Sequence, residues 1–337
     1  MELTELWFLL IGVLWVGFIF LEGFDFGVGM STQFLAKNEM EKRVLINTIG
    51  PHWDANEVWL LTAGGAMFAA FPHWYASLFS GYYLPFVLLL LALIARGVAF
   101  EFRGKQDSVK WKKTWDWSIF LGSLIPPFLV GVLFTGLIKG LPIDKNMNLH
   151  ASFFGDMVNF YTLVGGIAFV LLSYLHGLMF ITMKTDGDLR ARARKQALKL
   201  YWITGAVIVL FIALTGVYTN AFTNRGAIII PMYAIAVVLY LALYKLVKDK
   251  KEGFSFTSTG LILVLVTASF FIALFPNVMI ATDVANNITI YDAASGAYSL
   301  KVMTIVALTM VPIVLAYTIW SYYIFRKRVT HKEHLEY

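Results

Sequence analysis

Two pairs of carboxylates stand out in this sequence because each pair lies in or beside a strongly apolar segment. Glu22 and Asp25 are three residues apart, and Asp54 and Glu57 repeat this spacing. Residues three apart share one face of a helix, so each pair presents two acids to the same neighbour. Ionisable groups inside membrane-spanning helices are costly and therefore indicate function. Carboxylates that lie close together in a low dielectric cannot all ionise, so they hold a proton or bind a cation.

The neighbours of Asp25 and Asp54 make these two acids the main candidates. Asp25 lies in the run Gly23-Phe24-Asp25-Phe26-Gly27-Val28-Gly29, whose small residues allow another backbone or a large planar group to approach closely. Asp54 follows Gly50-Pro51 at an expected helix start, where the helix dipole favours an anion. We therefore predict that Asp25 and Asp54 belong to a proton path or a cation site. The further acids that we expect to contribute are Glu22, Glu57 and Glu101.

All of these acids also have an ordinary structural interpretation. They could cap helix starts, face headgroup water, or pair with Arg96 or Arg103. For Asp116, which closely follows Lys112 and Lys113, we prefer this structural interpretation.

The elements that must position these acids are membrane helices. Of the 337 residues, 59% are hydrophobic and 14% are charged, and the mean hydropathy is +0.70. Soluble chains contain about 45–50% apolar and about 25% charged residues. The composition therefore excludes a soluble enzyme and a disordered protein. The lack of cysteine excludes disulfide scaffolds, thiolate metal sites and c-type haem attachment.

A helix that crosses a bilayer needs about 20 mostly apolar residues. The sequence offers nine such segments, at residues 5–30, 52–71, 79–100, 117–138, 160–183, 198–220, 227–245, 256–276 and 300–325. We predict an all-α, polytopic membrane protein that forms a single integral-membrane domain over residues 1–337. The segment Phe71-Pro72-His73-Trp74 is expected to be an interfacial turn between the second and third spans.

The distribution of Lys and Arg predicts the orientation. If the spans alternate, only four of the 27 basic residues lie on one side, namely Lys139, Lys145, Arg225 and Lys301. The basic side is cytoplasmic by the positive-inside rule, which places the N-terminus outside and the C-terminus in the cytoplasm. The basic stretch 189–197 is expected to be a helical extension near anionic headgroups, and the net charge of +6 is assigned to the membrane surface and not to nucleic acid.

The histidines argue against a haem in this chain. His331 and His334 lie in the tail, His150 in an outer loop, His73 at the outer turn and His52 at the inner end of the second span. His176 alone lies well inside a span, and a bis-histidine haem needs a facing pair. We expect His176 to be a hydrogen-bonded core or interface residue. We expect no haem ligand and no catalytic residue in this chain, and we assign no metal ligand.

Several motifs together resemble subunit II of cytochrome bd-type quinol oxidases. The segments that carry the resemblance are LEGFDFGVGM at 21–30, PHWDANEVWL at 51–60, TAGGA at 62–66, WDW at 115–117, GSLIPP at 122–127, VMT at 302–304 and YTIW at 317–320. They follow the family's order over nearly the whole chain. By matching position, Asp25 and Asp54 resemble the acids to which a proton path or cation site is assigned in the family.

The resemblance implies a heterodimer in the bacterial cytoplasmic membrane. In the family, subunit I holds two haems b and one haem d, oxidises quinol on the outer side and reduces dioxygen to water with cytoplasmic protons. Subunit II is a pseudo-symmetric partner of nine helices, arranged as two four-helix bundles and one peripheral helix. We therefore expect a non-haem-ligating respiratory subunit that supports subunit I and contacts membrane lipids. The sequence does not decide whether it holds the structural quinone of some members or meets a small accessory subunit.

Two other function classes are consistent with the residues. A secondary transporter also places carboxylates and glycines in broken helices near the bilayer midplane, whereas these acids lie to one side and no internal repeat accompanies them. A non-catalytic scaffold that stabilises an oxidase without conducting protons is the third alternative.

Overall fold

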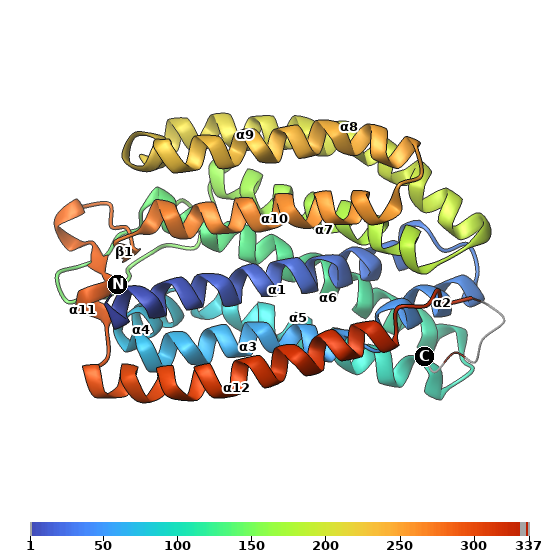
Figure 1. Ribbon diagram of the computed structural model, residues 1–337, viewed down its shortest axis with the longest axis horizontal. Coiled ribbons are helices and arrows are strands. Elements are labelled where there is room, and N and C mark those ends of the chain that lie inside the picture. Colours follow the sequence, from blue (N-terminus) through green and yellow to red (C-terminus); the bar gives the residue numbers. More distant parts are fainter. Residues whose placement is uncertain (1, 331–334, 336–337) are drawn as a thin grey trace.

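Long helices that run side by side dominate the computed structural model, which describes residues 2–330 and 335 (Figure 1). The helices are α1 (Leu3–Phe34), α2 (Glu39–Ile49), α3 (Trp53–Ala70), α4 (Pro72–Gly81), α5 (Tyr83–Phe102), α6 (Val109–Lys139), α7 (Phe160–Lys184), α8 (Gly187–Tyr218), α9 (Ala221–Lys248), α10 (Glu252–Leu274), α11 (Ile290–Ala293) and α12 (Ala297–Ile324). Short 3-10 helices at Arg103–Lys105 and Val284–Asn286 and the antiparallel strands β1 (Asn277–Met279) and β2 (Ile288–Thr289) complete the described chain. The predicted all-α class is confirmed.

Eight of the described helices are long and apolar enough to cross a membrane, namely α1, α5, α6, α7, α8, α9, α10 and α12. The predicted second span corresponds to α3, which has 18 residues and is less apolar because its first turns carry Asp54, Asn56 and Glu57. Helix α3 nevertheless lies alongside α1 and α12 (Figure 1). The number of nine crossings therefore stays a prediction.

The long helices form two neighbouring groups. Helices α1, α3, α5 and α6 pack together, and α7, α8, α9 and α10 form the second group. Helix α1 joins the groups, since it also packs against α7 and α10. Helix α12 lies on the outside of α1 and α3, and the start of α1 and the end of α12 lie at opposite ends of the described structure (Figure 1). This is the arrangement of two bundles and a peripheral helix that the resemblance implied.

Glycines bring α1 and α7 into backbone contact at the depth of the predicted site. A Cβ added to Gly27 would lie 2.2 Å from the carbonyl oxygen of Ser173 and 2.6 Å from the Cα of Gly177. A side chain at either glycine would therefore separate the two helices. The predicted close approach at the glycine run is confirmed, and its counterpart on α7 is Gly177. This contact fixes the position of Asp25, two residues before Gly27.

The predicted turn at Phe71-Pro72-His73-Trp74 is wrong, because Pro72 begins helix α4. Proline is tolerated in the first turn of a helix, where its missing N–H would have no partner in any case. Trp74 and Leu78 on this helix are buried, and their burial explains why the chain continues as a helix after the break at Phe71.

The basic stretch 189–197 does form a helical extension, as the first turns of α8. Its arginines form ion pairs within the chain, whereas we had predicted that the stretch lies near anionic headgroups. Arg190 and Arg194 each lie 2.6 Å from the carboxylate of Glu252, and Arg192 lies 2.6 Å from that of Glu41. These pairs tie α8 to α10 and α2.

Candidate functional site

Five polar residues from three helices meet in one buried group, which we call the acid–arginine cluster. It consists of Glu22 and Asp25 from α1, Asn56 and Glu57 from α3, and Arg96 from α5. Glu22, Asp25, Asn56 and Arg96 are fully buried, whereas the Glu57 side chain is 22% exposed. Asp25 lies nine residues before the end of α1, which corresponds to about 14 Å along the helix axis. The cluster therefore lies to one side of the bundle centre.

Arg96 is the cation of the cluster. Its Nη1 lies 2.7 Å from Glu22 Oε2 and 3.9 Å from Glu57 Oε2. The guanidinium also lies over the rings of Phe26 and Phe100, at 4.9 and 5.4 Å from their centroids. A guanidinium that is removed from water needs a paired carboxylate, and Glu22 supplies it.

Asp25 is held by a chain of hydrogen bonds that begins on α12. The hydroxyl of Tyr322 donates to Asn56 Oδ1 over 2.8 Å, and Asn56 Nδ2 donates to Asp25 Oδ2 over 2.7 Å. The Tyr322 ring stacks on the ring of His52, with centroids 4.1 Å apart. The peripheral helix thus reaches the cluster through one tyrosine, and Asn56 orients one oxygen of Asp25.

Several buried polar atoms of the cluster have no hydrogen-bond partner among the described residues. These atoms are Glu22 Oε1, Asp25 Oδ1, Glu57 Oε2, Arg96 Nε and Arg96 Nη2. Most buried polar groups in proteins are paired, so this group has unused capacity for a proton or for water. Three carboxyl groups share one guanidinium, and together they can hold at least one proton in the neutral form.

The composition of the cluster favours a proton over a metal ion. The positive charge of Arg96 repels a second cation at the same place. In the part of the chain that the structure describes, no three His, Cys, Asp or Glu side chains come together as metal ligands.

The structure does not bring Asp54 to Asp25, which corrects the predicted pair. Asp54 lies in the first turn of α3 and is exposed. The inner face of α3 carries Asn56, Leu60 and Ala63, which are buried, and Asp54 lies about 200° around the helix from Asn56. Of the four acids in the two pairs, Glu22, Asp25 and Glu57 therefore meet in the cluster and Asp54 does not.

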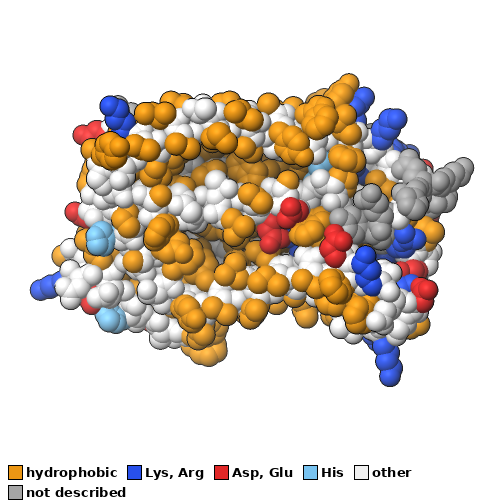
Figure 2. Space-filling view, turned by 90° about the horizontal axis from the view of Figure 1, so that it is seen from below, with side chains coloured by type: hydrophobic (Ala, Val, Ile, Leu, Met, Phe, Trp, Pro, Cys, Tyr) orange, Lys and Arg blue, Asp and Glu red, His pale blue; other side chains and the backbone are white. Residues whose placement is uncertain are grey.

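Glu101 also lies outside the cluster, in an exposed position at the end of α5. Asp54 and Glu101 both belong to the outer surface. Figure 2 views the molecule from the side of α12 and shows acidic side chains surrounded by hydrophobic ones on this face. The same view shows a hollow in the surface beside them.

Asp116 has the structural role that we preferred for it. It is buried, and its two oxygens accept hydrogen bonds of 2.6 Å from Arg103 Nε and Lys42 Nζ. Arg103 also donates two bonds of 2.8 Å to Glu39. This network joins the ends of α2, α5 and α6 and lies apart from the acid–arginine cluster.

His176 is the hydrogen-bonded core residue that we predicted. Its Nδ1 lies 2.7 Å from Thr259 Oγ1 and its Nε2 lies 3.2 Å from the carbonyl oxygen of Phe20. Both ring nitrogens are therefore engaged within the chain, and the ring stacks on Phe256.

The remaining histidines lie away from the cluster core. In the loop between α6 and α7, His150 Nε2 lies 2.8 Å from Asp144 Oδ2, and this hydrogen bond lowers the pKa of Asp144 to about 2. His73 is exposed on α4, and His331 and His334 lie outside the described residues.

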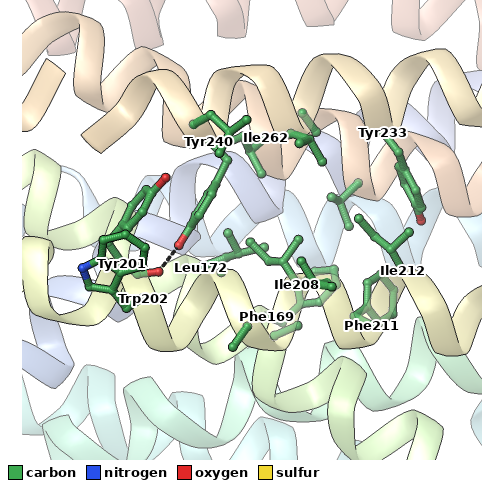
Figure 3. A pocket seen from close by; sticks show the side chains of 18 residues that line it. Phe169, Leu172, Tyr201, Trp202, Ile208, Phe211, Ile212, Tyr233, Tyr240 and Ile262 are labelled. Carbon is green, nitrogen blue, oxygen red and sulfur yellow. Dashed lines mark hydrogen bonds between the residues drawn. The ribbon is translucent and has the colours of Figure 1, made fainter. Parts of the chain in front are cut away.

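A separate apolar groove of about 370 Å³ lies between the helices of the second group (Figure 3). Tyr201 and Trp202 lie toward one end of it, and Phe211 and Tyr233 toward the other (Figure 3). The hydroxyl of Tyr240 donates to the backbone oxygen of Tyr201. The apolar lining offers a surface for a hydrocarbon chain from the bilayer, and none of the lining residues belongs to the acid–arginine cluster.

Three members of the site environment were not predicted as site residues. Arg96 was considered only as a partner for the acids, although an arginine inside an apolar span is itself a signal of function. Asn56 lies within the motif at 51–60, but nothing in the sequence pairs it with Asp25. Tyr322 carries no sequence signal, because a tyrosine near the end of a membrane helix is typical of an interfacial anchor.

Known proteins share both the sequence and the fold of this chain. Residues 3–325 match the family model described as cytochrome bd terminal oxidase subunit II. The chain belongs to this family. It is 56% identical over 337 residues to cytochrome bd ubiquinol oxidase subunit 2 of Bacillus subtilis, with 100% of this chain and 99% of that protein covered. It is 36% identical to cytochrome bd-I ubiquinol oxidase subunit 2 of Escherichia coli K12, with 99% and 97% covered.

A solved structure supports the fold. A chain in the structure of bd oxidase from Geobacillus thermodenitrificans superposes with a TM-score of 0.77 at 17% identity, covering 96% of this chain and 97% of that one. This subunit II is a component of a terminal oxidase of the respiratory chain, an oxidoreductase complex that uses haems and quinol. It functions in a complex with subunit I as a multi-pass protein of the bacterial cytoplasmic membrane. The transporter alternative receives no support.

Proposed function

We propose that the acid–arginine cluster of this subunit II takes up protons from the cytoplasm and delivers them toward the oxygen-reducing site in subunit I. In this proposal subunit I holds two haems b and one haem d, and reduction of dioxygen to water at these haems consumes the protons. The observation that supports it is the buried Asp25, which has one oxygen fixed by Asn56 and the other without a partner among the described residues.

Each residue of the cluster has a definite part in this proposal. Arg96 compensates the charge of Glu22 and keeps the pair buried. Asp25 holds the transferable proton on its unpartnered Oδ1, and Glu22 Oε1 is the corresponding free oxygen on the same face of α1. Asn56 cannot exchange a proton at neutral pH, so it positions Asp25.

Glu57 is the link between the cluster and water. Its side chain is 22% exposed and one of its oxygens lies 3.9 Å from Arg96. Asp54 lies one turn earlier on α3 and is exposed. Asp54 therefore collects protons at the surface, Glu57 passes them inward, and Asp25 holds them. This division keeps both predicted acids in one path, although they do not touch.

Turnover of an Asp25→Asn complex tests this function. Asparagine keeps the shape and can still bond to Asn56 but cannot carry a proton. We expect quinol oxidase activity to fall about tenfold or more with normal haem content and assembly, a loss typical of a removed proton-transfer group. Full activity across pH with full haem content would refute the proposal. Equal loss of haem and activity would assign Asp25 a structural role.

We also propose the orientation and the single domain predicted from the sequence, with nine crossings, the N-terminus outside and the C-terminus in the cytoplasm. The uneven distribution of Lys and Arg supports it. Because the chain has no cysteine, an Asp107→Cys variant offers a unique label in this subunit at an exposed site between α5 and α6. We expect an impermeant maleimide to reach it from the cytoplasmic side only. Labelling from the outer side would reverse the orientation.

We propose that subunit I covers the face formed by α3 and α5. This face carries large exposed apolar side chains, including Leu61, Phe68, Leu91 and Ile94. The exposed acids Asp54 and Glu101 lie at one end of it, in contact with cytoplasmic water. Carboxylates beside this face are costly in lipid, so a protein partner is a better neighbour than lipid for its apolar part. A photoreactive benzoylphenylalanine at Leu61 should cross-link to subunit I in the complex, whereas one at Val209 on α8 should not. Equal cross-linking at both positions, or none at Leu61, would exclude this interface.

A further inference from the structure

A second pocket, separate from the groove and from the acid–arginine cluster, opens between the end of α1 and the first turns of α8. Its volume is about 700 Å³. Its basic lining residues are Lys37, Arg192, Lys195 and Lys199, and its acidic one is Asp188. Apolar side chains, among them Phe34, Leu200 and Ile203, complete the lining. The proposed proton path uses none of these residues.

Two of the four basic groups are free to bind an external anion. Arg192 is held by Glu41 and Asp188, and Lys37 lies 3.9 Å from Asp188. Lys195 and Lys199 are exposed and form no ion pair within the part of the chain that the structure describes. They are four residues apart on α8 and so point to the same side of the helix. The pocket therefore carries a net positive charge with two ammonium groups unpaired.

The pocket changes from charged to apolar along α8. Lys195 and Lys199 come first, and Leu200 and Ile203 follow within one turn toward the middle of the helix. The side chains of Ile203 and Phe34 are 59% and 62% exposed, so they present apolar surface beside the ammonium groups. A basic rim above an apolar floor matches an amphiphile with an anionic head. Inorganic phosphate would use only the rim and leave the floor exposed to water.

We propose that this pocket binds an anionic glycerophospholipid, with its headgroup phosphate at Lys195 and Lys199 and its acyl chains along Phe34, Leu200 and Ile203. The occupant holds the extension of α8 against the end of α1. The site does not rest on the proposed proton path, because it shares no residue with it and needs only the membrane setting of the family.

Native mass spectrometry of the purified oxidase complex tests the site. The complex is titrated with phosphatidylglycerol or phosphatidylcholine of identical acyl chains. Each lysine near an anionic headgroup contributes about 1 kcal/mol, so the Lys195→Gln/Lys199→Gln complex should bind phosphatidylglycerol about 30-fold more weakly. The matched control is Lys110→Gln/Lys113→Gln, which removes two exposed lysines from α6 and should leave this affinity unchanged.

Three results would overturn the proposal. These are equal affinity of the native complex for the two lipids, unchanged affinity in the pocket variant, and an equal loss in the control variant, which would indicate general surface charge. If the pocket variant does not assemble, the native complex in nanodiscs provides the test. Hydrogen exchange of residues 187–203 should be slower in phosphatidylglycerol than in phosphatidylcholine nanodiscs, and equal exchange would also overturn the proposal.

Discussion

Replacement of Arg96 by methionine removes the guanidinium that three carboxyl groups share. The Arg96–Glu22 pair is 2.7 Å long, and both side chains are fully buried. Breaking a buried pair by removing one partner costs about 3–5 kcal/mol, since it leaves an uncompensated charge. Methionine keeps an apolar contact with Phe26 and Phe100, so this loss reports the charge. We expect Arg96→Met to lower the free energy of unfolding of the complex by about this amount.

A double-mutant cycle isolates the pair. Replacement of both partners by apolar residues, in Arg96→Met/Glu22→Leu, should cost less than the sum of the single variants by at least about 2 kcal/mol, because no lone charge remains buried. The assay is titration of the purified complex with SDS in mixed micelles. The control is the exposed pair Lys112–Asp107, whose coupling should be near zero.

The pH dependence sharpens this test. A lone Glu22 can escape its cost by taking up a proton, so Arg96→Met should be less destabilising at pH 5 than at pH 8. Additive single effects, or a loss that does not depend on pH, would refute the view that Arg96 balances the charge of this cluster.

The remaining predictions concern the supports of the cluster. Gly27→Ala should reduce assembly of the complex strongly, because its Cβ would lie 2.2 Å from the Ser173 oxygen and overpacking costs about 1–3 kcal/mol or more. Gly253→Ala on α10, with open space around it, should assemble normally, and equal yields of the two variants would contradict the contact. Tyr322→Phe should lower stability by about 1 kcal/mol through the lost bond to Asn56, with turnover within twofold in an oxidase assay. A large loss of turnover at full stability would place Tyr322 in the proton path itself.

The helices were predictable because membrane spans follow from length and hydropathy alone. Eight predicted spans correspond to helices that meet these criteria, and α3 does not meet them because Asp54, Asn56 and Glu57 lie in its 18 residues. Helices α2 and α4 were not predicted. In a single sequence a short amphipathic helix such as α2 resembles a loop, and a helix that begins with proline, such as α4, resembles a turn.

The site was predictable in part. Glu22 and Asp25 share the inner face of α1 as the spacing indicates, and the glycine run makes the backbone contact expected of it. The orientation of α3 was not predictable, because the spacing of Asp54 and Glu57 says that they share a face but not which face points inward. Burial of Asn56 decides this, and burial depends on packing against α1 and α12. The counter-charge from Arg96 depends in the same way on the neighbouring helix.

Proton uptake during a single turnover tests the central claim most directly. Fully reduced complex, with a pH indicator in the bulk solution, is mixed with dioxygen, and proton uptake is followed together with oxidation of the haems. The proposal predicts that Asp25→Asn slows proton uptake at least about tenfold while the initial binding of dioxygen keeps its native rate. The Asp107→Asn complex, altered at an exposed carboxylate outside the cluster, should take up protons at the native rate. Native uptake kinetics in Asp25→Asn complexes with full haem content would contradict the account.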